Sequence, residues 1–130
     1  MLHTGILNPA ILHLLARVRH TNTVVIADRG FPFWPSVETV DISLVDDIPT
    51  VLQVVRAIVP AYAYGQAYMA EEFLAHNPPA TRAAIETALA GIPLAFEPHE
   101  ASFKLRVPHA IGLIRTADTT PFANLILQSA

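Results

Sequence analysis

The chain has no cysteine and few charged residues, and both absences narrow what it can be. Without cysteine it cannot form a disulfide, a thiolate metal site or a cysteine nucleophile. Only 15% of its 130 residues are charged, the formal net charge is −3, and lysine and arginine form no run. A surface that binds nucleic-acid phosphates needs clustered positive charge. We therefore expect no nucleic-acid partner.

Long apolar runs are missing as well. No stretch of the sequence approaches the roughly 20 apolar residues of a membrane span, so we expect no membrane partner. The first residues, Met1 to Gly5, lack the charged and apolar regions of a signal peptide. These two absences make the cytoplasm the expected location.

What the chain does have is a high share of apolar residues, 52%. Residues 1–130 are enough for one domain with its own core. A protein of this size has a large surface and few charges to cover it. We therefore expect some apolar surface to be buried against other copies, in a homo-oligomer.

Helix and strand signals alternate along the sequence. Asn8-Pro9 begins a helix, with a capping side chain followed by proline at the first helical position. The apolar run 23–28 is typical of a strand buried on both faces of a parallel sheet. Further strands are expected over 37–45, 61–69, 93–97, 110–116 and 124–128. Further helices are expected from residue 47 to about 58, over 70–76, from the segment 78–81 through Leu89 with Gly91 ending it, and over 99–106. This order predicts an α/β protein, a three-layer α/β/α single domain with a mostly parallel sheet.

Several kinds of chemistry are excluded by spacing. The six histidines, at positions 3, 13, 20, 76, 99 and 109, form no ligand pair on one helix face, so we expect no metal. No serine lies in a G-x-S-x-G elbow, and Gly30, Gly65 and Gly112 stand alone instead of forming a phosphate cradle. We expect no cofactor. What remains is acid–base chemistry or simple binding.

Two polar residues flank the first predicted strand. His20 follows the first helix, where a histidine commonly interacts with the last carbonyls and the helix dipole. An imidazole also titrates near neutral pH and can transfer protons. Asp28 ends the apolar run, where its carboxylate either satisfies a turn or contacts a ligand at the carboxyl end of a parallel strand. The residues alone leave both alternatives open.

Two further segments, 98–104 and 121–124, carry polar groups near the other end of the chain. Read alone, the first is the start of a helix with His99 at its beginning and a core phenylalanine. In the second, the Asn124 amide can both donate and accept a hydrogen bond, and Phe122 places an aromatic ring beside it.

Taken in order, these segments resemble the ribose pyranase and fucose mutarotase family, and its ribose branch more than its fucose branch. Members of that family are small cofactor-independent enzymes that re-equilibrate the cyclic forms of free sugars such as D-ribose. The resemblance covers nearly the whole chain and is strongest over 4–59 and 97–128. It implies that His20 is the catalytic general acid and that the sugar is bound by Asp28, His99, Phe122, Ala123 and Asn124. It also implies a ring-based homo-oligomer, a decamer, with sites at subunit interfaces.

The chain departs from the family pattern at two places. One additional residue separates His99 from Phe103, and Phe122 stands where the family usually has tyrosine. A missing hydrogen bond costs about 0.5–1.5 kcal/mol, so the sugar can differ from ribose or the activity can be weak. Lys104, on a predicted helix, is expected to be a solvated surface residue.

The length of the first strand adds a geometric argument. An extended strand over 23–28 spans roughly 15–20 Å at about 3.3 Å per residue, so His20 and Asp28 lie near opposite ends of it. One small sugar cannot touch both residues within one subunit. We therefore expect neighbouring subunits to contribute parts of each site.

Two other functions remain open at this stage. One is a monosaccharide-binding protein without turnover, linked to transport or regulation, which the missing phenol at Phe122 favours. The other is a structural assembly protein, in which the aromatic loop 31–34 anchors an interface.

Overall fold

Six strands form one mixed sheet in the computed structural model, which describes residue 1, residue 3 and residues 5–130. Their order across the sheet is β2-β5-β1-β6-β3-β4. Strand β6 runs antiparallel to its neighbours β1 and β3, and the other neighbouring pairs are parallel. The strands are β1 (Thr23–Ala27), β2 (Thr39–Asp41), β3 (Tyr64–Ala70), β4 (Leu94–Glu97), β5 (Gly112–Arg115) and β6 (Leu125–Ser129). The predicted mostly parallel sheet is confirmed, with β6 as the exception.

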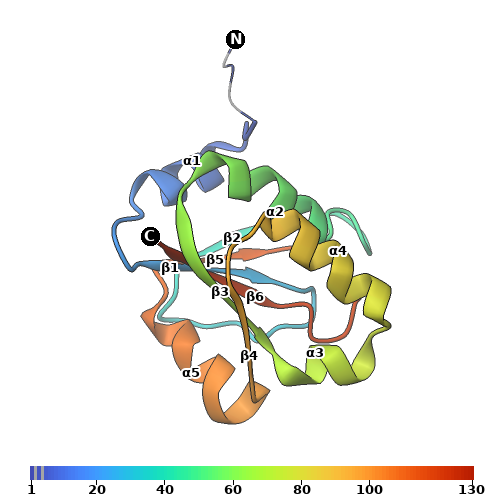
Figure 1. Ribbon diagram of the computed structural model, residues 1–130. Helices are drawn as coiled ribbons and strands as arrows, with labels where there is room; N and C mark the ends of the chain where they lie inside the picture. The colour runs from blue at the N-terminus through green and yellow to red at the C-terminus, as the bar shows by residue number, and fades with distance from the viewer. Residues whose placement is uncertain (2, 4) are drawn as a thin grey trace.

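Helices cover both faces of this sheet (Figure 1). Helices α1 (Pro9–Ala16), α2 (Val51–Ile58) and α4 (Pro79–Leu89) lie on one side. A π-helical turn (His99–Phe103), α5 (Lys104–Arg106) and the 3-10 turn that follows it (Val107–His109) lie on the other. Helix α3 (Glu71–His76) continues directly from β3, and a short 3-10 turn (Val59–Ala61) follows α2. The predicted three-layer arrangement is confirmed.

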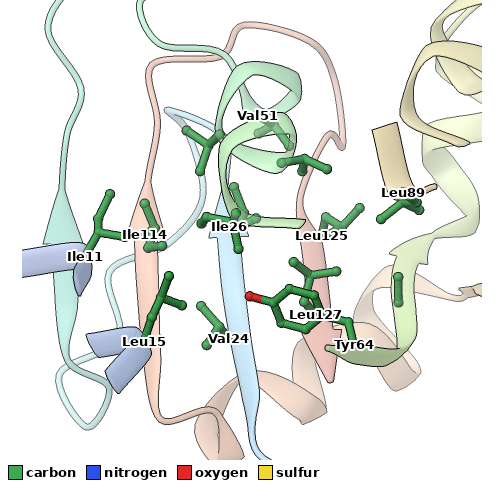
Figure 2. Packing of buried hydrophobic residues seen from close by; sticks show 14 of the residues in the cluster. Ile11, Leu15, Val24, Ile26, Val51, Tyr64, Leu89, Ile114, Leu125 and Leu127 are labelled. Carbon is green, nitrogen blue, oxygen red and sulfur yellow. The ribbon is translucent and has the colours of Figure 1, made fainter. Parts of the chain in front are cut away.

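Alternate side chains of β1 pack into two apolar clusters, one on each face of the sheet. Val24 and Ile26 face α1 and α2, and Figure 2 shows both among the buried side chains of neighbouring strands and helices. Val25 and Ala27 face the opposite side, where they pack with Phe103 of the π-helical turn. These four of the five β1 residues are at most 1% exposed. The strand is thus buried on both faces, as its continuous apolar run predicts.

The start of α1 and the end of α4 are set by the residues that the sequence predicts. The Asn8 side chain caps α1 by accepting hydrogen bonds from the backbone amides of Ala10 and Ile11. At the end of α4, Ala90 and Gly91 have φ angles of 53° and 91°. This left-handed backbone ends the helix at the predicted place.

Two predicted elements are shorter in the structure. The prediction of a strand over 37–45 is wrong beyond its centre, because β2 ends at Asp41. The Asp41 carboxylate accepts hydrogen bonds from the amide and the hydroxyl of Ser43, a turn that takes the chain out of the sheet. The second predicted helix starts at Val51 because Thr50 caps it in a capping box.

Gly112 provides a test of the packing between β5 and α1. A β-carbon at this position would overlap the Leu14 side chain, which is fully buried and can move only by displacing other core residues. We expect Gly112→Ala to lower the free energy of unfolding by about 1–3 kcal/mol, measured by urea denaturation. Gly5→Ala is the control, because a β-carbon there meets no described atom within 4 Å. Equal losses in the two variants would contradict this packing.

Candidate functional site

The Asp28 carboxylate is held at the carboxyl end of β1. Its Oδ1 accepts a hydrogen bond from the Gly30 amide at 3.0 Å, and its Oδ2 accepts one from Asn124 Nδ2 at 3.0 Å. Burial raises the pKa of the Asp28 carboxyl, and these two hydrogen bonds oppose part of that rise. Asp28 is therefore a partly buried acceptor whose orientation is set from two sides.

Asn124 reaches Asp28 because β6 pairs antiparallel with β1. The register places Ile26 opposite Leu125, so the residue before β6 lies beside the residue that follows β1. Asn124 Oδ1 accepts a hydrogen bond from the Asp28 amide at 2.7 Å, while its Nδ2 donates to the carboxylate. The side chain is buried and makes two bonds to one residue. This pairing fixes which way the amide faces, with one N–H left to donate.

His99 begins the π-helical turn and is packed among aromatic rings. Its ring lies edge-on to Phe31 and Phe122, with centroids 6.2 and 5.2 Å away, and stacks on Phe103 at 5.8 Å. The side chain is 12% exposed. Within the described chain, its Nε2 is buried and has no hydrogen-bond partner. A buried polar atom without a partner is costly, and a ligand hydroxyl would satisfy it.

Phe122 faces His99 from the opposite segment. Its backbone φ is 56°, the left-handed region that is uncommon for a bulky residue. Its ring contacts the rings of His99 and His76, whose centroids are 5.2 and 4.9 Å away. Unusual backbone of this kind persists where surrounding contacts hold it, often at functional sites.

These groups line one open pocket of about 370 Å³, a size that suits a small ligand. Its lining consists of Asp28, Gly30, Phe31, Pro32, His99, Lys104, Phe122 and Asn124. A larger cavity, of about 470 Å³, lies between α1 and the end of α2. Its lining is almost wholly apolar, so it offers few groups to orient a sugar. The smaller pocket is the better candidate because it combines carboxylate, imidazole, amide and aromatic groups.

The structure brings together four of the six predicted site residues: Asp28, His99, Phe122 and Asn124. Ala123 lies between the last two, but its methyl group is buried in the core cluster on the other face of the sheet. Ala123 is not part of the pocket lining. His20 is exposed at the other end of β1, outside this pocket.

Gly30, Phe31, Pro32 and Lys104 also line the pocket and were not predicted as site residues, and Lys104 is the one of these four with a charged side chain. The expectation of a solvated surface lysine is wrong: the side chain is 24% exposed, lines the pocket and donates to Glu100 Oε1 at 2.7 Å. The reason is the π-helical turn, in which the Phe103 amide donates to the Pro98 carbonyl five residues earlier, at 3.0 Å. A turn of this kind accommodates one residue more than an α-helical turn. The helix predicted over 99–106 is present, with a π-helical first part (His99–Phe103) that continues into the α-helical residues Lys104–Arg106.

The aromatic loop contributes to the pocket more than to the surface. Phe31 is buried and packs on Trp34 and Phe103, with ring centroids 6.3 Å away in each case. Phe33 is 71% exposed and is the part of this loop that is free to contact a partner.

Neither a metal-binding cluster nor a membrane-spanning helix is found among the described residues. Among residues 1, 3 and 5–130, no group of three or more His, Asp or Glu side chains is arranged to hold a metal ion. Over the same residues, none of the helices has both the length and the apolar character to cross a membrane.

The Asp28–Asn124 pair predicts a pH-dependent loss of stability. Asn124→Asp replaces the donor 3.0 Å from Asp28 Oδ2 with a second carboxylate oxygen. The folded pair then holds one proton with a pKa above the ordinary carboxyl value. The loss of unfolding free energy relative to the unmodified protein is therefore expected to be small at low pH and to grow as pH rises through that raised pKa.

Urea denaturation at pH 5 and pH 8 measures this difference. Asn22→Asp is the matched control, since Asn22 Oδ1 only accepts a hydrogen bond from the Arg19 amide. The same pH dependence in both variants would show that the contact with Asp28 is not its cause.

Comparison with known proteins gives relatives along the whole chain. Residues 1–130 match the family described as the RbsD / FucU transport protein family. The D-ribose pyranase of Geobacillus kaustophilus is 40% identical over 129 residues, 99% of this chain and 93% of that protein. The D-ribose pyranase of Chromobacterium violaceum is 41% identical over 125 residues, 96% of this chain and 94% of that protein.

Solved structures give the same result. RbsD of Bacillus subtilis, complexed with D-ribose, has a TM-score of 0.92 and 32% identity, over 100% of this chain and 98% of that one. The fucose mutarotase of Streptococcus pneumoniae, in complex with L-fucose, has a TM-score of 0.82 over the same shares but is only 16% identical, which shows the fold alone. The resemblance stated from the sequence, nearer to the ribose branch, is confirmed. This chain belongs to the RbsD/FucU family.

Proposed function

We propose that this protein is a cofactor-independent sugar isomerase that interconverts the pyranose and furanose forms, or the anomers, of a free monosaccharide such as D-ribose in the cytoplasm. The observation that carries the proposal is the pocket in which Asp28, His99, Phe122 and Asn124 meet. Support comes from D-ribose pyranases that are about 40% identical over nearly the full length. A relative with a TM-score of 0.92 was solved with D-ribose bound.

The chemistry needs only proton transfer and orientation. The anomeric hydroxyl loses its proton, the ring oxygen gains one, and the bond between the anomeric carbon and the ring oxygen breaks. The open aldehyde rotates, and a hydroxyl adds to it to close a new ring. No electrons are exchanged with another molecule, so proton carriers and positioned hydrogen bonds suffice.

Four of the pocket residues have roles in sugar binding that fit their contacts. The Asp28 carboxylate, whose orientation is fixed by hydrogen bonds from Gly30 and Asn124, accepts a hydrogen bond from a sugar hydroxyl. The unpartnered Nε2 of His99 supplies a second polar contact. Asn124 retains one amide N–H after its bonds to Asp28, and the Phe122 ring covers an apolar face of the sugar.

His20, the proposed proton donor, is supplied by a neighbouring copy. The five residues of β1 separate it from Asp28 by roughly 16 Å at about 3.3 Å per residue, too far for one monosaccharide. A contact between the His20 end of one subunit and the pocket of the next joins two different surfaces. Such a heterologous contact closes into a ring when its rotation permits. The ring-based decamer expected for the family has this property.

Exposed apolar side chains beside the pocket support this arrangement. Phe33 follows the pocket residue Pro32 and is 71% exposed, and Leu105 follows Lys104 and is 64% exposed. Both would be covered by a neighbouring copy seated over the pocket mouth.

The shared site is tested with two variants that are inactive for different reasons. His20→Ala and Asp28→Asn are each expected to abolish catalysed exchange between ribose forms, measured by saturation-transfer NMR. In oligomers co-assembled from equal amounts, about a quarter of the activity should return, because one site in four pairs an intact Asp28 with an intact His20.

The control for this experiment is His13→Ala, an exposed histidine on α1 that should leave exchange unchanged. If His20→Ala is fully active, His20 is not the proton donor. If the variants are inactive but no activity returns on mixing, each site belongs to a single subunit.

The missing phenol at position 122 makes a second prediction. Phe122→Tyr is expected to lower the Kd for D-ribose about 2- to 10-fold, the equivalent of one restored hydrogen bond. Calorimetry measures this change. Phe96→Tyr is the control, because that ring packs against Arg82 away from the pocket. An unchanged affinity in Phe122→Tyr would mean that the far edge of the ring does not face the sugar.

Phe122 also favours one alternative function, a monosaccharide-binding protein without turnover. A lost polar contact can separate binding from catalysis. Binding of ribose by calorimetry, with no exchange by NMR, would establish that alternative.

A further inference from the structure

Helix α3 (Glu71–His76) touches both segments that form the pocket, although none of its residues lines the pocket. Its outer contacts go to the backbone of His99 and to the segment that carries Phe122. The helix is itself anchored by Phe73, which is 1% exposed in the main core cluster. A rigid element is therefore in place between the two sides of the candidate site.

The first contact is made by Glu72. Its Oε2 and Oε1 accept a hydrogen bond from the His99 backbone amide at 3.0 and 3.3 Å. This amide is the first of the π-helical turn, so it has no partner within the turn, and the preceding Pro98 offers no side-chain cap. Glu72 thus caps the turn from a distant part of the chain and sets where His99 begins.

The second contact is made by Asn77, which directly follows α3. Its Nδ2 donates to the carbonyl of Phe73 at 2.9 Å and to the carbonyl of Pro121 at 2.9 Å. Pro121 precedes Phe122, whose left-handed backbone needs support from its surroundings. Through these two hydrogen bonds, Asn77 connects the backbone next to Phe122 to α3.

The third contact is the ring of His76 on the ring of Phe122, with centroids 4.9 Å apart. His76 Nδ1 donates to the carbonyl of Glu72 at 2.8 Å, because a carbonyl can only accept. The His76 ring is therefore fixed on its own helix. The Phe122 ring thus contacts two histidine rings, His99 edge-on and His76 in a tilted arrangement.

We propose that Glu72, His76 and Asn77 are positioning residues of the sugar site, which hold His99 and Phe122 at a fixed separation. The effect of these residues on catalysis rests on the proposed function, because it requires that the pocket acts on a sugar. Glu72 carries most of it, because it alone of the three is hydrogen-bonded to a residue that contacts the sugar. A small displacement of a positioned group costs much of its effect on rate and affinity.

The decisive comparison is Glu72→Ala against Glu71→Ala. Both remove an acidic side chain from the first turn of the same helix, but Glu71 is exposed and only Glu72 reaches His99. We expect Glu72→Ala to slow ribose exchange about 10- to 100-fold and Glu71→Ala to leave it unchanged. Glu72→Gln, which retains an acceptor oxygen, should restore most of the rate.

A double-variant cycle separates positioning from general damage to the fold. Because Glu72 acts through His99, Glu72→Ala should have little further effect on ribose Kd when added to His99→Ala. Additive effects in this cycle, or equal rates for Glu72→Ala and Glu71→Ala, would overturn the proposal.

NMR signals of the His99 imidazole give a readout that needs no sugar. They should shift in Glu72→Ala and stay in place in Glu71→Ala. If the unmodified protein neither binds ribose nor accelerates exchange between its cyclic forms, the proposed function fails. The comparison of His99 signals still decides in that case whether Glu72 positions His99. Unshifted His99 signals in Glu72→Ala would refute the positioning role itself.

Discussion

The antiparallel pairing of β6 with β1 is the constraint on which the candidate site depends. It brings Asn124 next to Asp28, 96 positions apart in the chain, so that amide and carboxylate bind each other through two hydrogen bonds. A carboxylate at the end of a strand buried on both faces would otherwise be costly. These bonds offset part of that cost and leave the carboxylate turned toward an open pocket.

The rest of the pocket is attached to this pair by longer-range contacts. The π-helical turn adds His99 and Lys104, and α3 connects that turn to the segment carrying Phe122. The result is a site built on element ends, where rigid structure holds polar groups that loops leave open. His20 stands apart at the opposite end of β1, so the proposed proton transfer needs contact between copies.

Most of the fold could be predicted from local signals, and half of the residues that line the pocket could be predicted through the family resemblance. The helix start at Asn8 and the buried strand over 23–28 follow from capping and apolar runs, which act over a few residues. The early end of β2 and the late start of α2 were missed, because Asp41 and Thr50 bind nearby backbone groups in competition with regular structure. Lys104 was missed because lysine on a helix is usually solvated, and only the packing of the π-helical turn against the pocket places this side chain in the lining.

The sequence by itself determined the α/β class, the continuous burial of β1 and the absence of thiol chemistry, because each depends on residue type and short-range order. Only the tertiary structure decided that β6 is antiparallel to its neighbours and that Asn124 orients Asp28. It also decided that Glu72 of α3 accepts a hydrogen bond from the His99 amide. These features join residues far apart in the chain. Their geometry follows from strand register and packing, which no local pattern encodes.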